Sequence, residues 1–453
     1  MTTSPVSDDR RFPDCCAAYA HPLSDAKTLK VRIEELLREN TNEGYSKLLD
    51  AYYCYVQPSR SKYPFQWFWD SCFHVFMLCS IGELQLAKRN LWSLFAMQEP
   101  NGFVGHMIFW KRVFPTTPSD VLQSRPTFGQ MRPHMSALIQ PSFAAQALLR
   151  IADESKDTEY VQVMLPKIKR YLEWVMQNRD FDGDHLITII SPVESGMDFK
   201  PSYDEVLGYK GEGEPDRGLF LKAVRSDMRN FRNRYDLKRV KKARGFLVKD
   251  VTVNTAFALD LAAVAEICER IGDPDAQKWR DASAKVTHAI RTLMYDEKDA
   301  AFYDLRGPDN HKLRVKTPTI FFPMILPGIP DEMCGKIVER HLHHSSAFAA
   351  PFPLPSCAMD ERQFYAKDTW YLWRGPTWIF NNWFLHRAFL ERGFTEEADA
   401  LLKTCHALID IGGLREYYDP LTGEGEGEEH FTWSGLVMDM MWRANKNSTS
   451  HKV

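Results

Sequence analysis

The sequence lacks any long uncharged hydrophobic segment. It has no run of about 18 apolar residues, the length that a membrane-spanning helix requires. The first residues, MTTSPVSDDRRFPDCC, contain no apolar core of the kind that a secretory signal peptide carries. We therefore expect a protein that is neither membrane-spanning nor secreted, with a cytoplasmic location.

The cysteines are too scattered for a disulfide framework or a zinc site. Nine occur between Cys15 and Cys405, and apart from the adjacent Cys15 and Cys16 none are close in sequence. No CxxC pair is present, and an odd number of dispersed thiols is typical of a reducing compartment. The pattern indicates reduced cysteines.

Neither sign of charge dominates the chain. It carries 57 Lys and Arg against 60 Asp and Glu, so no overall field favours nucleic acid or an anionic membrane as a partner. The hydrophobic fraction of 44% is that of an ordinary globular protein with a large core. Because no change in composition divides the chain, we predict one domain over residues 23–445, a disordered or loosely attached segment 1–22 and a frayed tail 446–453.

Patterns typical of β-strands are scarce, and helical patterns dominate. Only residues 186–190 and 301–305 alternate in the manner of strands. The predicted helices are residues 25–49, 70–95, 141–151, 161–177, 253–271, 273–294, 330–341, 378–391, 396–410 and 432–444. No repeat of fixed period indicates a solenoid. Helices joined by connections of uneven length favour an all-α toroid of paired inner and outer helices.

Four long loops interrupt these helices. They are residues 102–133, 191–217, 345–376 and 412–431. Long ordered loops on a helical scaffold commonly carry binding and catalytic groups. We expect them to form a cap over an active site.

Five aromatic side chains precede the predicted helix that begins at residue 70. Residues 63–70 read YPFQWFWD, and Asp70 could cap this helix. Aromatic rings beside a carboxylate suit a sugar, because its C–H face stacks on a ring while its hydroxyls seek hydrogen-bond acceptors. Trp67, Trp69 and Asp70 are equally compatible with core packing and helix capping.

Two acids flank a glycine in the second long loop, where residues 194–198 read ESGMD. Burial can raise the pKa of a carboxyl such as Asp198, which keeps it protonated and able to donate a proton near neutral pH. On local grounds alone, a simple turn is the favoured interpretation of this segment.

Two further clusters lie near the C-terminus. Residues 370–378 contain three tryptophans besides Tyr371 and Arg374, more than a helix start requires, so we expect a ligand-facing wall there. Residues 414–424 read LREYYDPLTGE, and Glu416 lies among aromatic residues where a carboxylate could hold a water molecule. A surface acid in a turn-rich connection is an equally good interpretation of Glu416.

Taken in order, these blocks resemble those of the family 63 glycoside hydrolases. The segments WFWD, ESGMD, WRGPTW, EYYDPLTGEG and TWSG follow one another, and the resemblance extends from about Tyr63 to Trp442. Within that family the sequence is most similar to the mannosylglycerate and glucosylglycerate hydrolases. The resemblance implies an (α/α)6 barrel, an inverting hydrolysis of an α-glycosidic bond, and no metal or organic cofactor.

The resemblance also implies roles for single residues. Asp198 is similar to the family's general acid and Glu416 to its general base, with carboxyl groups about 6.5 to 9.5 Å apart so that a water molecule fits between base and sugar. The residues expected to bind substrate are Tyr63, Trp67, Trp69, Asp70, Gln98, Gln140, Trp373, Arg374, Gly375, Trp378 and Trp433.

A glycerate leaving group requires a cation and hydroxyl donors. The stretch from Lys222 to Lys249 contains eleven Lys and Arg, and it could supply these groups through Arg229 or Arg232 together with Tyr235. A solvated helix face explains the same stretch. Nucleic-acid binding is disfavoured because the basic stretch is local and the whole chain is slightly acidic.

Other functions remain open at this point. Bacterial glucosylglycerate hydrolases commonly continue the acid motif with Asn-Ser-Pro, whereas residues 199–201 read FKP here. The pair formed by Asp198 and the next residue is similar to that of trehalases, so a trehalase-like or other α-glucosidase is the main alternative. A carbohydrate-binding protein would need the tryptophans but not both carboxylates. A metal-dependent enzyme would have to use the histidines of 341–344 or the acids of 424–429. The partner that we expect is a small sugar substrate, and a homo-oligomer is left open.

Overall fold

The computed structural model describes residues 22–47, 50–110, 122–123, 134–343, 346–367 and 371–450. The predicted disordered segment 1–22 lies outside these residues except for its last position. At the other end, helix α16 (Leu436–Ser450) includes residues 446–450, which the sequence analysis assigns to a frayed tail.

Helices make up most of the described chain. The long helices are α2 (Ala26–Glu39), α3 (Phe68–Ile81), α4 (Leu84–Ala96), α6 (Ala144–Ser155), α7 (Thr158–Arg179), α9 (Arg217–Arg232), α11 (Val251–Ile271), α12 (Ala276–Ala289), α14 (Ile379–Arg392), α15 (Thr395–Gly412) and α16. The shorter helices are α8 (Asp204–Leu207), α10 (Leu237–Ala243), α13 (Asp331–Val338) and the turns η1 (Pro192–Ser195), η2 (Pro201–Tyr203), η3 (Ile290–Met294), η4 (Pro318–Ile325), η5 (Glu339–His343) and η6 (Thr432–Gly435).

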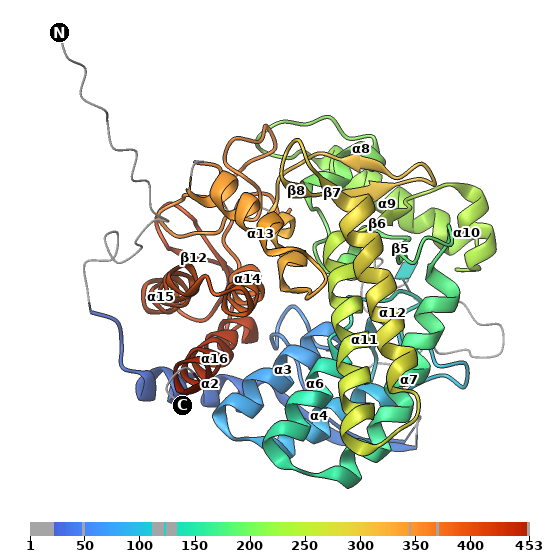
Figure 1. The fold of residues 1–453 in the computed structure, drawn as a ribbon, viewed down its shortest axis with the longest axis vertical. Coiled ribbons are helices and arrows are strands. Elements are labelled where there is room, and N and C mark those ends of the chain that lie inside the picture. Colours follow the sequence, from blue (N-terminus) through green and yellow to red (C-terminus); the bar gives the residue numbers. More distant parts are fainter. Residues whose placement is uncertain are drawn as a thin grey trace.

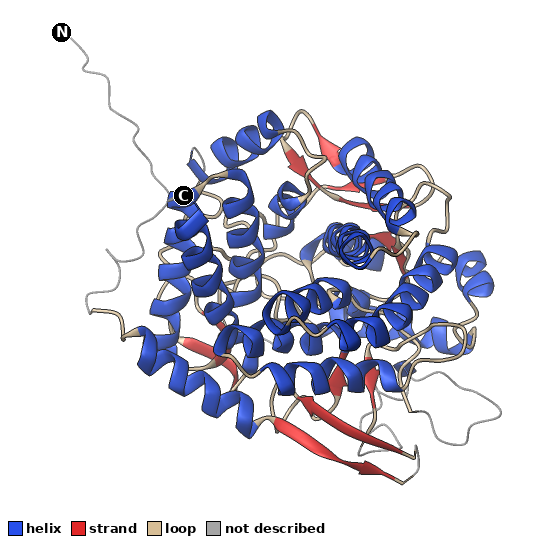
Figure 2. Cartoon of the chain, turned by 60° about the horizontal axis from the view of Figure 1, so that its bottom comes forward, coloured by secondary structure: helices blue, strands red, loops and turns tan. Residues whose placement is uncertain are grey.

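The helices form an inner and an outer ring (Figures 1 and 2). Within the described residues, the inner ring runs through α3, α6, α11, η4, α14 and α16, and each of these packs against the next. Contact between α16 and α3 closes the ring. Outer helices follow inner ones along the chain, so that α4 packs on α3, α7 on α6, α12 on α11 and α15 on α14. The predicted all-α (α/α)6 barrel is confirmed.

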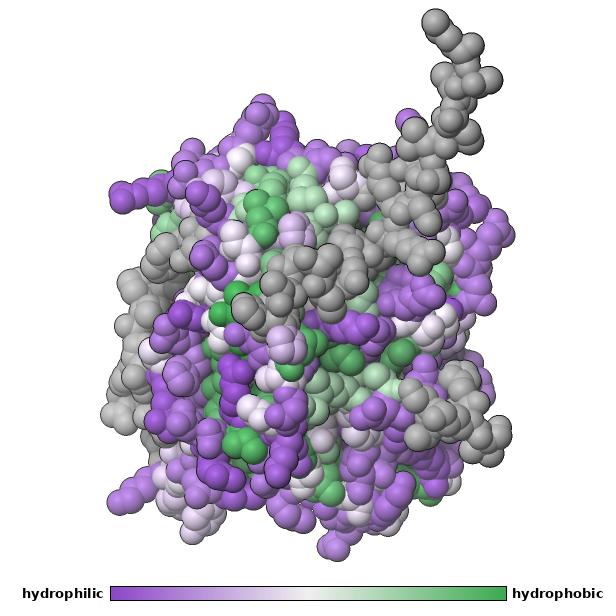
Figure 3. All heavy atoms as spheres, turned by 90° about the vertical axis from the view of Figure 1, so that its left-hand side faces the viewer, coloured by the Kyte–Doolittle hydropathy of each residue, from purple (hydrophilic) through white to green (hydrophobic). Residues whose placement is uncertain are grey.

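Burial explains the composition of the two rings. In α3 every residue except Ser80 is buried, so this helix is apolar on all sides. Helix α11 is long and apolar enough to cross a membrane, yet 83% of its apolar window is buried among other helices, as expected for a core helix. Outer helices expose one side, and the face of the molecule that includes α15 shows hydrophilic residues around smaller hydrophobic patches (Figure 3).

The N-terminal helix is shorter than its pattern predicts. The predicted helix 25–49 ends at Glu39, because Asn40 caps it and donates its side-chain amide to a carbonyl of the last turn. The chain then forms an antiparallel hairpin of β1 (Thr41–Ser46) and β2 (Ala51–Val56).

Four other predicted helices are divided. Residues 330–341 form α13 and the start of the π-helical turn η5, and residues 432–444 form η6 and the first part of α16. Residues 70–95 form two helices, because Gly82 adopts a φ of +94° and ends the first of them. Residues 273–294 form α12 and then the π-helical turn η3.

Short β-ladders order the connections between helices. An antiparallel sheet has the order β10-β9-β6-β5, and two-stranded ladders join β3 to β4, β7 to β8 and β11 to β12. The strands are β3 (Gln66–Trp67), β4 (Met107–Ile108), β5 (Thr188–Ile189), β6 (Val248–Lys249), β7 (Tyr295–Asp296), β8 (Ala301–Phe302), β9 (Asp304–Arg306), β10 (His311–Leu313), β11 (Arg415–Tyr418) and β12 (Gly425–Glu429). The predicted strand 186–190 contains β5, and the predicted strand 301–305 contains β8 and the start of β9.

A buried ion pair fixes the segment that carries Asp198, residues 191–208, which we call the acid loop. The Glu194 carboxylate accepts hydrogen bonds from both terminal nitrogens of Arg179, at 2.8 and 2.5 Å. It also accepts the backbone N–H groups of Ile139 at 2.9 Å and Ile190 at 2.7 Å. Both charged side chains are 0% exposed, and Glu194 is therefore a structural residue of its motif.

Replacing Arg179 by Met should destabilise the protein strongly. The substitution leaves the Glu194 carboxylate buried without its counter-ion, which typically costs about 3–5 kcal/mol of unfolding free energy. The matched control is Lys278→Met, since Lys278 forms a 2.6 Å pair with Glu173 on the surface, and such pairs contribute about 0–1 kcal/mol. Denaturant unfolding measures both variants, and equal losses of stability would contradict the assignment.

Candidate active site

Glu416 is a buried carboxylate held by donors from two segments. It lies on β11 and is 2% exposed. Tyr63 donates its hydroxyl to Oε1 at 2.6 Å, the backbone N–H of Glu428 donates to Oε2 at 3.0 Å, and the Lys62 ammonium lies 3.0 Å from Oε2 and 3.4 Å from Oε1. Every one of these groups is a donor, which suits an ionised carboxylate.

The β11–β12 hairpin is shaped around this carboxylate. Its register shifts between Arg415 and Tyr417, so the ladder is irregular at Glu416 itself. Gly427 has a φ of +64°, and a side chain there would meet the Tyr417 ring and come within 2.9 Å of Glu416 Oε2. Glycine is therefore required beside the carboxylate.

Asp198 is a partly exposed carboxyl on the acid loop. Burial by the surrounding protein raises its pKa to about 6, and the negative charges of Asp227 and Glu416 act in the same direction while Lys62 opposes them. A carboxyl with this pKa remains partly protonated close to neutral pH, as a general acid requires.

Asp70 is the third carboxyl of the site. It is 3% exposed in the first turn of α3, where Trp67 rather than Asp70 occupies the capping position, so the predicted cap was wrong. The indole N–H of Trp433 donates to Asp70 Oδ1 at 2.6 Å. Burial raises the pKa of Asp70 to about 7, although this hydrogen bond lowers it.

A close glycine contact holds the acid loop against the aromatic block. Gly196 has a φ of +72°, and a Cβ atom there would lie 2.1 Å from the Trp69 ring. Only glycine fits, so the turn that precedes Asp198 rests directly on Trp69.

A buried charge cluster holds the other side of the acid loop. Lys200 pairs with Asp250 and lies 2.8 Å from Asp304, and Tyr203 donates its hydroxyl to Asp250 at 2.6 Å. All of these side chains are buried. The Phe-Lys-Pro sequence after the acid therefore has a structural role through Lys200.

The predicted tryptophan wall is a packed platform. The rings of Trp373 and Trp378 stack at 3.8 Å between centroids, and each residue is 2% exposed. Trp433 packs edge-on against Trp69 at 5.0 Å and lies 5.6 Å from Trp378. These rings cover much of one another's surface, and the substrate contacts expected of Trp373 and Trp378 stay a prediction. Trp370 lies outside the described residues.

Tyr63 and Trp67 are the aromatic residues of the first block that keep accessible surface. Trp67 forms T-shaped contacts with Tyr63 at 5.8 Å and with His106 at 5.5 Å. The indole N–H of Trp67 and the His106 Nε2 atom are buried without a hydrogen-bond partner. Such groups need a partner when the site is filled, and sugar hydroxyls could provide it.

Arg374 and Gly375 support the acid loop. The Arg374 guanidinium forms two hydrogen bonds with Asp204, at 2.9 and 2.7 Å, and is buried. A Cβ atom at Gly375 would lie 2.0 Å from the Tyr365 carbonyl oxygen, so the backbone is packed too closely for a side chain. The side chain thus positions the loop that bears Asp198, and direct contact of Arg374 with substrate stays a prediction.

Gln98 lies outside this constellation. Its amide nitrogen donates to the carbonyl groups of Gly102 and Lys167, at 2.9 and 2.8 Å, and its oxygen accepts from Arg170 at 3.2 Å. These bonds use the side chain for packing on α7, which corrects its predicted substrate role. Gln140, by contrast, reaches the site, since its oxygen accepts the Trp69 backbone N–H at 3.2 Å.

The residues that were predicted to bind the aglycone have other contacts in this structure. Arg229 is exposed on α9 and packs over Gly245, and Tyr235 is buried with its hydroxyl donating to the Leu122 carbonyl oxygen. Neither observation involves a substrate, so the aglycone roles of Arg229 and Tyr235 stay predictions. Arg232 is exposed as well.

The sequence analysis missed Lys62 and Asp227. Lys62 directly precedes the aromatic residues 63–70, and its position next to Tyr63 is the sequence feature from which its place in the site could have been predicted. Asp227 lies on the buried face of α9, is 8% exposed and accepts a 2.6 Å hydrogen bond from Ser191. Burial raises the pKa of Asp227 to about 6. Because two positions along a helix turn a side chain by about 200°, Asp227 faces inward while Arg229 faces outward.

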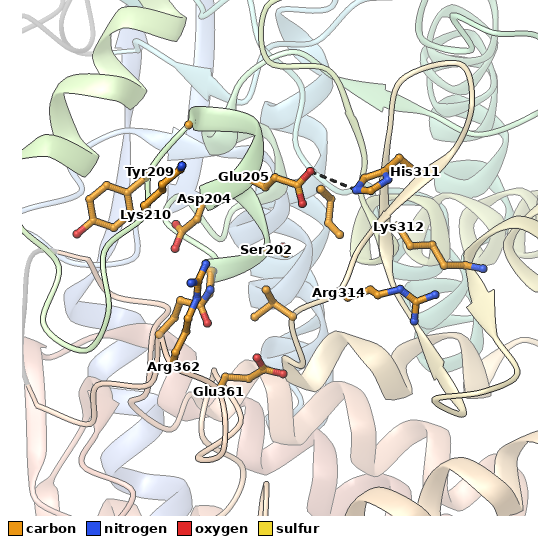
Figure 4. Close-up of a pocket in the computed structure, with 15 residues that line it drawn as sticks. Ser202, Asp204, Glu205, Tyr209, Lys210, His311, Lys312, Arg314, Glu361 and Arg362 are labelled. Atoms are coloured by element: carbon orange, nitrogen blue, oxygen red, sulfur yellow. Dashed lines mark ion pairs between the residues drawn. The ribbon is translucent and has the colours of Figure 1, made fainter.

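A cavity of ≈ 870 Å³ borders the acid loop, but neither Asp198 nor Glu416 lines it. Lys210 and Arg362 lie on one side of it and Lys312 on the other, and Glu205 forms an ion pair with His311 at its edge (Figure 4). It is therefore separate from the candidate catalytic carboxylates.

The histidines considered as metal ligands have other partners. His341 Nε2 lies 2.9 Å from the Asp299 carbonyl oxygen, and His343 lies 2.8 Å from Glu397. His344 is outside the described residues. Across the described ranges, no group of three His, Cys, Asp or Glu side chains is arranged to hold a metal ion.

Comparison with known proteins adds independent information. The family model described as "Mannosylglycerate hydrolase MGH1-like glycoside hydrolase domain" matches residues 63–434. Mannosylglycerate hydrolase MGH1 of Selaginella moellendorffii is 26% identical over 440 residues, which cover 90% of this chain and 84% of that protein. Mannosylglycerate hydrolase of Thermus thermophilus is 27% identical over 416 residues, covering 84% and 95%.

Two further similarities complete the comparison. Glucosylglycerate hydrolase of Mycolicibacterium hassiacum is 25% identical over 419 residues, covering 83% of this chain and 91% of that protein. The crystal structure of a GH63 mannosylglycerate hydrolase from Thermus thermophilus in complex with Tris and D-glycerate superposes with a TM-score of 0.78 at 23% identity, covering 91% of this chain and all of that one. The shared fold is the (α/α)6 barrel.

Replacing Asp227 by Asn should lower the pKa of Asp198. The substitution removes a negative charge that favours the protonated acid, so Asp198 should deprotonate at lower pH and the basic limb of the pH–rate profile should move downward. The profile of kcat/KM against pH measures this effect. The control Glu212→Gln changes an acid whose side chain is 68% exposed and should leave the limb in place. A limb that stays fixed or moves upward in Asp227→Asn would refute the assignment.

Proposed function

The chain belongs to the mannosylglycerate hydrolase MGH1-like family of glycoside hydrolases, and from this premise we propose that it cleaves the α-glycosidic bond of mannosylglycerate or glucosylglycerate with inversion, releasing hexose and glycerate. The observation that carries the proposal is the contrast between its two carboxyls. Asp198 has a raised pKa of about 6, and Glu416 is surrounded by the donors Tyr63, Lys62 and Glu428.

The proposed reaction divides the work between these groups. Asp198 gives its proton to the glycosidic oxygen as the bond from that oxygen to the anomeric carbon breaks. Glu416 takes a proton from a water molecule, whose oxygen forms the new bond on the opposite face of the sugar. Glycerate leaves with the proton of Asp198, and proton exchange with solvent restores both carboxyls.

The hexose subsite is proposed from the groups that surround this pair. Tyr63 and Trp67 keep accessible aromatic surface for the C–H face of the sugar. Asp70 offers a carboxyl, and the unpartnered indole N–H of Trp67 and Nε2 of His106 offer polar atoms for hydroxyl groups. These groups gather around a single position, so they suit one monosaccharide unit better than a long chain.

A substrate panel tests the reaction and its stereochemistry. Purified protein with mannosylglycerate, glucosylglycerate and trehalose should hydrolyse one or both glycosylglycerates, and NMR should detect the β-hexose first. Trehalose cleavage alone would favour the trehalase-like alternative. An α-hexose as the first product would overturn inversion.

Amide substitutions test the two carboxyls. Asp198→Asn and Glu416→Gln should each lower kcat by about 10²- to 10⁴-fold, the usual contribution of a positioned acid or base. Glu424→Gln is the matched control, because Glu424 is an exposed acid of the same hairpin, and its kcat should remain near that of the unaltered protein. Retention of turnover in either amide variant would remove that residue from the mechanism.

A further inference from the structure

The cavity of ≈ 870 Å³ beside the acid loop is lined by three segments that lie far apart in sequence. They are residues 201–210, residues 311–315 and residues 361–363. The backbone N–H of Gly213 donates to the Arg362 carbonyl oxygen at 2.8 Å, which joins the first segment to the third. The volume lies within the range of about 300–1,000 Å³ that is usual for small-molecule sites. The cavity can therefore hold a ligand of moderate size.

The three carboxylates that line the cavity each have a cationic partner from outside the lining. The pairs are Asp204 with Arg374 at 2.7 Å, Glu205 with Arg306 at 2.8 Å and Glu361 with Lys316 at 3.9 Å. The negative charges of the lining are thus balanced by the protein itself, and they do not require a cationic ligand.

Three of the lining cations are held more loosely. Lys210 is exposed and forms no ion pair with any described residue. Arg362 lies 3.5 Å from Glu212, and with side chains 59% and 68% exposed this pair is weak. Lys312 lies 3.5 Å from Asp296. Positive charge is therefore available on both sides of the cavity (Figure 4), which favours an anionic ligand.

Gln363 adds a hydrogen-bond acceptor to this lining. The residue is 4% exposed, and its Oε1 atom is buried and accepts no hydrogen bond from the described residues. A buried acceptor without a donor is destabilising, so a ligand hydroxyl that donates to it gains an interaction that the protein does not supply. The lining thus favours a ligand that carries hydroxyl groups as well as an anionic group.

A phosphorylated sugar combines both features. A phosphate group carries about 1.5 to 2 negative charges near neutral pH and three acceptor oxygens. It can therefore be shared by Lys210 and Arg362, which lie on the same side of the cavity (Figure 4). The hydroxyl groups of the sugar ring can donate to Gln363 Oε1.

The cavity wall is connected to the catalytic acid by two short paths. Asp204 lines the cavity, and the Arg374 guanidinium that binds it also donates to the carbonyl oxygen of Phe199, the residue after the acid, at 3.4 Å. Ser202 lines the cavity as well and donates to Asp304 at 2.6 Å, a member of the buried charge cluster that holds the acid loop. Networks of this kind carry coupling between sites.

We propose that this cavity is an effector site for a phosphorylated sugar, separate from the catalytic carboxyls, and that its occupancy raises the rate of the reaction. The bound ligand joins the acid loop to residues 361–363 and so holds the loop in place. A firmly held acid transfers its proton more effectively, because small displacements of a catalytic group reduce the rate steeply.

Calorimetric titration with glucose 6-phosphate, glucose and inorganic phosphate tests the site. Glucose 6-phosphate should bind about 10- to 100-fold more tightly than glucose, the range of hydrogen bonds to a charged group. The double variant Lys210→Met/Arg362→Met should lose this preference. Gln363→Met should weaken binding of glucose 6-phosphate and leave that of inorganic phosphate unchanged. Equal binding of inorganic phosphate and glucose 6-phosphate by the unaltered protein would overturn the assignment of a sugar.

The matched control is Lys278→Met/Arg280→Met, which removes a lysine and an arginine from surface ion pairs on α12 and should bind like the unaltered protein. Thermal unfolding midpoints check that all variants fold. Equal binding of glucose 6-phosphate by the unaltered protein and by Lys210→Met/Arg362→Met would show that it binds elsewhere and overturn the inference.

Kinetics at saturating substrate separate this cavity from the active site, which is then occupied. Glucose 6-phosphate should raise kcat to a plateau in the unaltered protein and leave it unchanged in Lys210→Met/Arg362→Met. An increase in KM alone would place the ligand in the active site and contradict the inference. The kinetic measurement rests on the proposed function, whereas calorimetry needs no turnover. A protein that binds glucose 6-phosphate at this cavity but cleaves neither glycosylglycerate would refute the proposed function alone, so the two failures are distinguishable.

Discussion

Glu194 accepts hydrogen bonds from backbone N–H groups that would otherwise lack a partner inside the barrel. The acid loop enters the protein interior, where backbone N–H groups cannot reach water and must find partners. A single carboxylate accepts N–H groups from Ile139, before α6, and from Ile190, after β5, while Arg179 at the end of α7 balances its charge. Asp198 follows four residues later, so the position of the acid depends on this buried pair.

Several motif residues serve this positioning and do not touch the reacting atoms. Gly196 allows the loop to rest on Trp69, Arg374 binds Asp204, and Lys200 binds Asp250 and Asp304. The backbone of Thr377 pairs with that of Tyr418. This pairing joins the segment that carries Trp373 and Trp378 to the β11–β12 hairpin that carries Glu416. A catalytic geometry needs such support because small displacements of an acid or base reduce the rate steeply.

The parts of the molecule that could be predicted are those that local sequence determines. Apolar segments such as residues 253–271 form inner helices, because a helix surrounded by others must be apolar on all sides. Asp198 and Glu416 are predicted as acid and base from the order of their motifs, because each segment alone is typical of an ordinary turn. Side-chain direction could not be predicted from residue type: the basic stretch suggested Arg229 as a ligand, yet the buried face of α9 carries Asp227. The tryptophans of the WRGPTW segment stack on each other, because packing between blocks far apart in sequence decides which ring faces remain open.

Two carboxyls that act on one glycosidic bond need different neighbours if one is to give a proton and the other to take one. Asp198 has the negative Asp227 nearby, which favours its protonated form, whereas Glu416 has Lys62 as its counter-ion. The two neighbours also differ in freedom. Asp227 is buried and hydrogen-bonded to Ser191, so its position near the acid is fixed. Lys62 is partly exposed on a flexible stem, so the positive charge beside the base is held less firmly than the negative charge beside the acid.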